Sequence, residues 1–122
     1  MTKRILIVED NALVREMYRS ALKLTGAELI ETQRGELVFD IVRRERPNLV
    51  ILDLILPDIS GKDVAMRLKA SPETSAIPLL AVSNAVTAGD ETSLKSIGFA
   101  GLVTKPVDIR SFAQTVARFI GA

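Results

Sequence analysis

The sequence of 122 residues contains no cysteine and no histidine. Without cysteine the chain can form no disulfide, no thiolate nucleophile and no thiolate metal site, which fits a reducing compartment such as the cytoplasm. Without histidine it lacks the commonest general base at neutral pH and the usual zinc ligand. If the chemistry of this chain needs an imidazole, a partner must supply it.

Long hydrophobic runs and an excess of one charge are also missing. The 16 basic and 15 acidic residues leave a formal net charge of +1, so we expect neither nucleic acid nor an anionic membrane as a partner. The apolar run at residues 5–8 is too short for a signal peptide, and no other run could span a membrane. The densest basic cluster, Arg43, Arg44 and Arg46, is expected to end a helix, where cations are favourable.

The composition, 48% hydrophobic and 25% charged, is typical of a globular chain, and we expect one domain over residues 1–122. Short apolar runs have the length and composition of strands, the second being the weakest: residues 4–8, 27–31, 49–53, 78–82 and 101–104. Amphipathic segments separate these runs. Strict alternation of strand and helix predicts an α/β fold with a doubly wound parallel sheet and helices on both faces.

The amphipathic segments also predict which side chains pack inward and where helices begin. We expect the inward residues to be, in chain order, Val14, Met17, Ala21 and Leu24; Leu37, Val38, Ile41 and Val42; Val64 and Leu68; Leu94 and Ile97; and Ile109, Phe112, Val116 and Phe119. The expected helix boundaries are Gly26 at the end of the first helix, Ser60 and Thr87 at the starts of the third and fourth, and Asp108 near the start of the fifth.

One carboxylate, Asp53, stands inside the apolar stretch LVIL-D-LIL. A buried charge without a partner is costly, so either this side chain lies outside the core or a cation meets it. The carboxyl ends of parallel strands meet at one edge of a sheet, where function collects. We therefore expect Asp53 to stand at that rim rather than in the core.

Polar residues end three of the other strands as well. Glu9 and Asp10 follow the first strand, Ser83 ends the fourth, and Lys105 follows the fifth. Each is a weak signal alone, since an acidic pair before a helix can simply cap it and a serine can cap a turn. Together they place three carboxylates and one lysine at one edge, where unscreened carboxylates would repel by roughly 3 kcal/mol per pair. Hard oxygen ligands favour Mg²⁺, and a carboxylate beside Mg²⁺ and lysine is a plausible nucleophile toward phosphorus.

Four blocks of the sequence match one known family in order and spacing. ILIVEDN, VILDLILPDISG, LLAVSNA and GFAGLVTKPVD resemble the receiver domains of two-component response regulators, over essentially the whole chain. The nearest resemblance is to stand-alone receivers of bacterial cell-cycle and chemotaxis signalling. The resemblance implies a flavodoxin-like fold, (βα)5, with strand order 2-1-3-4-5.

The resemblance also implies roles for the rim residues. Asp53 would accept a phosphoryl group, Lys105 would contact that group, and Ser83 would hydrogen-bond it and draw the following loop inward. The implied ligands of Mg²⁺ are Glu9, Asp10, Asp53 and the backbone carbonyl of Ile55. The family often has an aromatic residue three positions before the lysine, and Leu102 occupies that position here, which puts the usual signalling step in doubt.

The partners follow from the same resemblance. The donor would be a phosphohistidine on a histidine kinase or histidine phosphotransferase. The chain would not be an enzyme in the ordinary sense, because it would catalyse only its own Mg²⁺-dependent phosphorylation and dephosphorylation. A downstream protein would bind the face made by the fourth helix, fifth strand and fifth helix, and the protein would be a monomer or weak dimer in the cytoplasm. The Lys105–Pro106 bond is expected to be cis.

Other interpretations stay open at this point. A flavin or nucleotide module would need a glycine-rich loop after the first strand, which VEDNALVRE lacks. A phosphatase with an aspartate nucleophile commonly has Asp-x-Asp after the first strand, where this chain has Glu-Asp-Asn. The chain could also be a receiver cut from a longer regulator, although its end favours a single-domain protein. It could instead be a receiver-shaped module that binds proteins without phosphorylation.

Overall fold

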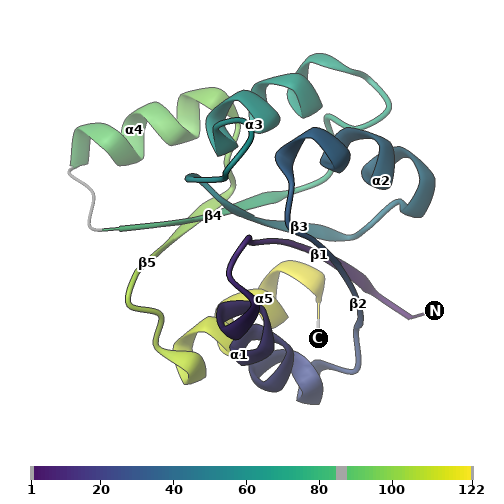
Figure 1. The fold of residues 1–122 in the computed structure, drawn as a ribbon, viewed down its shortest axis with the longest axis vertical. Coiled ribbons are helices and arrows are strands. Elements are labelled where there is room, and N and C mark those ends of the chain that lie inside the picture. The colour runs from purple at the N-terminus through teal and green to yellow at the C-terminus, as the bar shows by residue number, and fades with distance from the viewer. Residues whose placement is uncertain (1, 85–87, 122) are drawn as a thin grey trace.

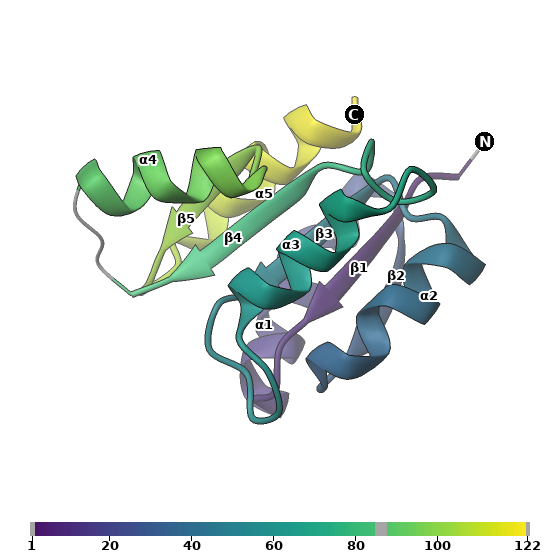
Figure 2. The ribbon, with the colours of Figure 1, turned by 90° about the horizontal axis from the view of Figure 1, so that it is seen from above.

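Five parallel strands form one sheet, covered by helices on both faces (Figures 1 and 2). The computed structural model describes residues 2–84 and 88–121. The sheet has the order β2-β1-β3-β4-β5, so the predicted flavodoxin-like α/β fold is confirmed. The elements are β1 Arg4–Val8, α1 Ala12–Leu22, η1 Lys23–Thr25, β2 Glu28–Thr32, η2 Gly35–Leu37, α2 Val38–Glu45, β3 Leu49–Asp53, α3 Gly61–Ala70, β4 Leu79–Ser83, α4 Ala88–Ile97, β5 Gly101–Thr104 and α5 Ile109–Ile120.

Each strand sends alternate side chains into two separate cores. Ile5 and Ile7 of β1 pack with α1 and α5, whereas Leu6 and Val8 pack with α2, α3 and α4. β3 alternates in the same way, with Leu49 and Ile51 in the core beneath α1 and α5 and Val50 and Leu52 in the other core. Because successive side chains point to opposite faces, residue 53 shares the face of residues 49 and 51, and residue 9 continues the row of residues 5 and 7.

Helix α1 packs through different residues from those expected. Tyr18 and Leu22 are its buried residues, whereas Met17 is partly exposed and Leu24 is 98% exposed. The prediction of Leu24 and Met17 as inward residues is therefore wrong. The α-helix ends at Leu22 and tightens into the 3₁₀ turn η1, which has three residues per turn and so rotates Leu24 away from the buried stripe. Gly26, with φ +73°, closes this turn as predicted.

The remaining helices mostly follow the sequence pattern. Leu37 and Ile109 were expected to face inward, but both are exposed, and this prediction is wrong. Leu37 ends η2 and Ile109 begins α5, so both precede the buried residues of their helices, which start at Val38 and Phe112. Ser60 caps α3 and Asp108 caps α5, each accepting backbone N–H groups, as predicted. The predicted cap at Thr87 lies outside the described residues. Strands β2 and β4 each begin and end one residue later than predicted.

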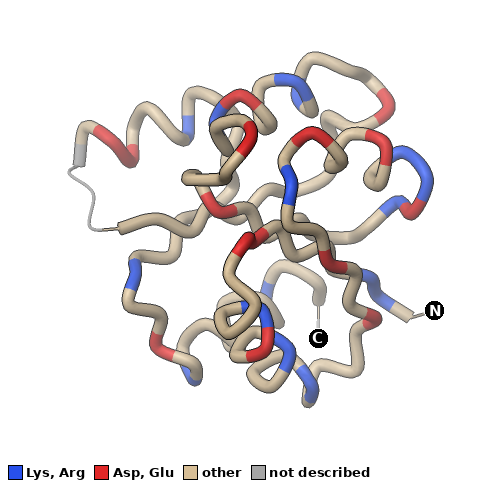
Figure 3. The backbone as a smooth tube through the Cα atoms, in the orientation of Figure 1, with Lys and Arg blue, Asp and Glu red and all other residues tan. Residues whose placement is uncertain are grey.

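Basic and acidic residues are interspersed along the backbone rather than separated by sign (Figure 3). Arg43 and Arg44 lie in the last turn of α2, and Arg46 follows as its C-cap with φ +50°, so the basic cluster ends a helix as predicted. In the part of the chain that the structure describes, no helix is both long enough and apolar enough to cross a bilayer.

The two leucines at the end of α1 provide a direct test of this packing. Leu22→Ala should lower the free energy of unfolding by about 2–5 kcal/mol, because it leaves a cavity in a fully buried site. Leu24→Ala should change it by less than about 0.5 kcal/mol, since the side chain is almost fully exposed. Urea denaturation followed by circular dichroism measures both. Equal destabilisation by the two changes would contradict the assigned face of α1.

Candidate functional site: an acidic cluster at the carboxyl edge of the sheet

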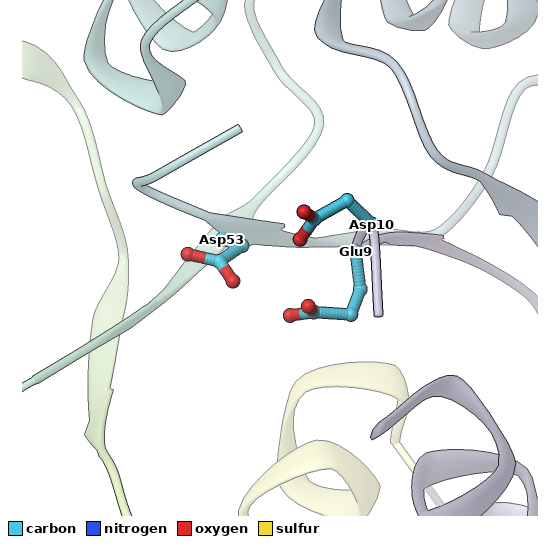
Figure 4. A group of neighbouring side chains, drawn as sticks. All are labelled: Glu9, Asp10 and Asp53. Carbon is cyan, nitrogen blue, oxygen red and sulfur yellow. The ribbon is translucent and has the colours of Figure 1, made fainter. Parts of the chain in front are cut away.

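Three carboxyl groups meet where β1 and β3 end side by side. Glu9 and Asp10 directly follow β1, and Asp53 is the last residue of β3. One oxygen from each carboxyl lies within 4.8 Å of the others, and Figure 4 shows the Glu9 and Asp10 side chains extending toward the side of Asp53. The sequence prediction that these three residues come together is confirmed by this geometry.

Lys105 supplies the cation that the aspartate in the apolar stretch requires. Its Nζ donates to Asp53 Oδ2 at 2.8 Å. Lys105 follows β5, which lies beyond β4 from Asp53, and its backbone N–H donates to the Ser83 carbonyl at 2.6 Å. The Lys105–Pro106 bond is cis, as the resemblance implied.

Asp53 stands at the rim of the sheet, as predicted, but its side chain is not exposed. The residue is only 3% exposed, so the expectation that it avoids burial is wrong. Burial alone would favour the neutral acid. The neighbouring Glu9 side chain, the Lys105 ammonium and the Ile55 N–H, which donates to Oδ1 at 2.9 Å, outweigh burial and lower the pKa of Asp53 below its ordinary value. The Asp53 carboxylate is therefore ionised at neutral pH.

Glu9 has the opposite character, and nothing in the sequence signalled it. It is 2% exposed, its Oε1 accepts the Asn11 N–H at 3.1 Å, and its Oε2 is buried without a hydrogen-bond partner. Burial first, and then the neighbouring Asp53 carboxylate, raise the pKa of Glu9 to about 8. In the absence of a bound cation, Glu9 is therefore mostly protonated at neutral pH.

The start of α1 shows whether the acidic pair Glu9-Asp10 serves as a helix cap. Asn11 caps α1, its side chain accepting from the N–H groups of Leu13 and Val14, so the interpretation of Glu9 and Asp10 as the helix cap is wrong. Asp10 is exposed at the mouth of the cluster.

Arg15, which the sequence interpretation missed, fixes the backbone of the cluster. Its Nη1 donates to the Glu9 carbonyl at 2.8 Å, and its Nε pairs with Glu31 at 3.3 Å. An arginine in the second turn of an amphipathic helix carries no pattern that would have revealed this contact.

Ser83 ends β4 at the same carboxyl edge of the sheet, one residue beyond Val82, which pairs with Asp53. Its residue lines a hollow between the β3–α3 loop and α4, together with Ile55, Ser60, Lys62 and Asp90. The loop expected to move with Ser83 spans residues 83–89, of which 85–87 lie outside the described residues. Leu102 is partly buried and packs against the core beneath α2, α3 and α4.

The donor set fits a hard divalent cation. Three carboxyl groups converge, and the cluster includes a buried oxygen, Glu9 Oε2, with no partner in the protein. Among the described residues this is one of two such buried side-chain atoms, the other being the Tyr18 hydroxyl. Carboxylate oxygens with open positions are the ligands that Mg²⁺ uses beside phosphate groups. The single lysine in contact with Asp53 does not neutralise all three carboxyl groups when they are ionised.

Comparison with known proteins shows the family of this chain. Residues 5–117 match the response regulator receiver domain. The polar-differentiation response regulator DivK of Brucella ovis is 34% identical over 121 residues, covering 99% of this chain and 98% of that protein.

Solved structures agree with this match. A response regulator from Desulfuromonas acetoxidans is 28% identical with a TM-score of 0.85, covering 98% of this chain and 97% of that one. The receiver domain of a sensor histidine kinase from Pseudomonas aeruginosa, with a magnesium ion in its active site cleft, is 21% identical with a TM-score of 0.86, covering both chains fully.

The chain therefore belongs to the response regulator receiver domain family. It is a receiver of two-component phosphorelay signalling and not a conventional enzyme, and membership of this family implies a histidine kinase as phosphodonor. The flavin, nucleotide and phosphatase interpretations are set aside by this match.

The raised pKa of Glu9 predicts how stability depends on pH in metal-free protein. The folded state holds the Glu9 proton up to about pH 8, whereas the unfolded chain releases it near 4.5. The stabilisation is complete below about pH 4.5 and is lost as the pH rises to about 8, with a slope of up to about 1.4 kcal/mol per pH unit. Glu9→Gln should remove most of this slope in urea denaturation with chelator present.

A matched change at an exposed carboxylate, Glu73→Gln, should leave the slope as it is in the unmodified protein. The lowered pKa of Asp53 acts in the other direction and in another range, since its stabilisation is lost only as the pH falls through acidic values. An unchanged slope in Glu9→Gln would contradict the protonation state assigned to Glu9.

Proposed function

We propose that residues 1–122 act as one receiver domain that accepts a phosphoryl group on Asp53. The observation that carries this proposal is the 2.8 Å contact of Lys105 with an ionised carboxylate that faces two further carboxyl groups. Phosphoryl transfer requires mainly positioning and neutralisation of charge on the transferred oxygens. The acidic edge of this sheet supports both, because it holds one nucleophilic carboxylate, one lysine and a set of metal-binding oxygens.

The transfer takes its histidine from the partner, since this chain has none. One carboxylate oxygen of Asp53 attacks the phosphorus of a phosphohistidine on a histidine kinase or histidine phosphotransferase. The new P–O bond forms as the P–N bond breaks, and the electron pair of that bond stays on the imidazole nitrogen of the donor. Lys105 lies close enough to Asp53 to neutralise the charge that arrives with the phosphoryl group.

Mg²⁺ is the cofactor that we assign to the acidic cluster. Glu9, Asp10, Asp53 and the backbone carbonyl of Ile55 would hold it. When bound, Mg²⁺ neutralises phosphoryl oxygens and aligns them for transfer. The magnesium ion in the Pseudomonas aeruginosa receiver supports this assignment by likeness of fold.

The output is a change in protein binding. We place the downstream partner on the face formed by α4, β5 and α5, because Ser83 connects the site to the loop that leads into α4. The protein would work as a monomer or weak dimer in the cytoplasm, with no nucleic acid or membrane partner. Two alternative functions are kept beside this one. The chain could bind proteins without phosphorylation, which Leu102 in place of an aromatic residue favours. It could also be a receiver cut from a longer regulator, as the Pseudomonas aeruginosa receiver domain is part of a sensor histidine kinase.

The phosphoacceptor assignment is tested by intact-protein mass spectrometry after treatment with a small phosphodonor. The unmodified protein should gain the mass of one phosphoryl group when Mg²⁺ is present and should gain none in excess chelator. Asp53→Asn should not gain it, because the nucleophilic carboxylate is absent, whereas Asp63→Asn in the first turn of α3 should behave like the unmodified protein. Full phosphorylation of Asp53→Asn would refute the assignment.

The role of Ser83 is tested by binding of a downstream partner before and after phosphorylation. A hydrogen bond to a charged phosphoryl group contributes about 1.5–3 kcal/mol, or roughly a tenfold to hundredfold change in affinity. Ser83→Ala should abolish most of the gain on phosphorylation, whereas Ser83→Thr should retain it because it keeps the hydroxyl. Leu102→Ala should mainly reduce stability. If Leu102→Ala removes the gain and Ser83→Ala keeps it, Ser83 does not transmit the signal.

A further inference from the structure

The loop between β3 and α3, residues 54–60, is attached directly to the Asp53 carboxylate. The Ile55 N–H donates to Asp53 Oδ1 at 2.9 Å. At the far end of the loop, the Gly61 N–H donates to the Leu54 carbonyl at 2.9 Å. The conformation of this loop therefore sets both the orientation of the Asp53 carboxyl and the position of the Ile55 backbone.

A second carboxylate in the same loop ties it to a distant segment. Asp58 Oδ1 accepts the Gly35 N–H and Asp58 Oδ2 accepts the Glu36 N–H, each at 2.9 Å. These N–H groups begin η2, whose own N-cap residue, Arg34, does not cap them with its side chain. Asp58 thus caps η2 from another part of the chain. Burial opposes its charge slightly, but the N–H groups of Glu36 and Gly35 outweigh burial and lower the pKa of Asp58.

Apolar contacts hold the loop and η2 together from the other side. A Cβ added to Gly35 would lie 2.8 Å from Ile59 Cγ1, 2.9 Å from Val64 Cγ2 and 3.1 Å from Leu56 Cδ1. There is consequently no space between η2 and the loop for even one methyl group. The two attachments, one polar and one apolar, are independent observations that place residues 56–59 firmly on η2.

We propose that Asp58 is a positioning residue for the acidic site. By holding residues 54–60 on η2, it keeps the Ile55 N–H aimed at Asp53 and the Ile55 carbonyl at the edge of the cluster. This proposal rests on the proposed function for its consequence in phosphorylation, but its effect on the cation site can be measured separately. Groups that orient metal ligands from outside typically change metal affinity tenfold to a hundredfold when they are removed.

Mg²⁺ titration of the full chain tests the proposal. Calorimetry measures the Mg²⁺ affinity, and nuclear magnetic resonance records the backbone amide signal of Ile55. Asp58→Ala should weaken Mg²⁺ binding about tenfold, at the low end of that range because the loop keeps its apolar contacts. It should also shift the Ile55 amide resonance in metal-free protein. Asp58→Asn should give a smaller effect, because its carboxamide oxygen replaces one acceptor while its NH₂ group faces an N–H donor.

Thr74→Val is the matched control for a general loss of stability. Thr74 is buried in the turn after α3, at the opposite edge of the sheet, and its hydroxyl donates to the Leu68 carbonyl. This variant should lose stability while keeping the Mg²⁺ affinity of the unmodified protein. The proposal is overturned if Asp58→Ala binds Mg²⁺ within twofold of the unmodified protein, or if Thr74→Val weakens binding as much as Asp58→Ala does.

The outcome separates this proposal from the proposed function. Should the unmodified protein bind Mg²⁺ but fail to accept a phosphoryl group on Asp53, the proposed function fails and the positioning role is still decided by the titration. Should phosphorylation of the unmodified protein succeed while Asp58→Ala leaves Mg²⁺ affinity and the Ile55 resonance unchanged, only the positioning role fails.

Discussion

The contact between Lys105 and Asp53 is the interaction on which the acidic edge depends. At 2.8 Å and an effective dielectric near 20, the attraction is about 6 kcal/mol, while each further ionised carboxylate within 4.8 Å repels Asp53 by at least about 3 kcal/mol. One lysine therefore roughly offsets two neighbouring carboxylates and leaves no surplus. The proton on Glu9 removes one of these two repulsions. The two buried acids differ in pKa because burial dominates at Glu9, whereas the contacts with Lys105 and the Ile55 N–H outweigh burial at Asp53.

This balance depends on segments that lie far apart in the sequence. Lys105 reaches Asp53 across β4, and the Lys105 N–H is fixed by the Ser83 carbonyl. Arg15 holds the Glu9 carbonyl from α1, and Asp58 connects the loop after β3 to η2. The acidic edge is thus supported by three backbone contacts, made with β4, α1 and η2. A cluster of like charges needs such support, because its own side chains repel one another.

The sequence predicted the strands, the helix caps at Ser60 and Asp108, and the meeting of polar residues at one edge, because these follow from local periodicity and from the geometry of parallel sheets. The strand order came from the family resemblance. Burial of Asp53 and Glu9, exposure of Leu24, and the contacts of Arg15 and Asp58 were not predictable. Each depends on how a loop or a 3₁₀ turn packs, and neither leaves a periodic signal.

Strand alternation places a strict limit on how this chain can vary in length. Glu9 continues the row of Ile5 and Ile7, and Asp53 continues that of Leu49 and Ile51, so both acids lie on the α1 and α5 side of the sheet. Inserting or deleting one residue within β1 or β3 would turn one acid to the opposite face while leaving the composition almost unchanged. Any variant of this scaffold that keeps the acidic site must therefore preserve the parity of these two strands.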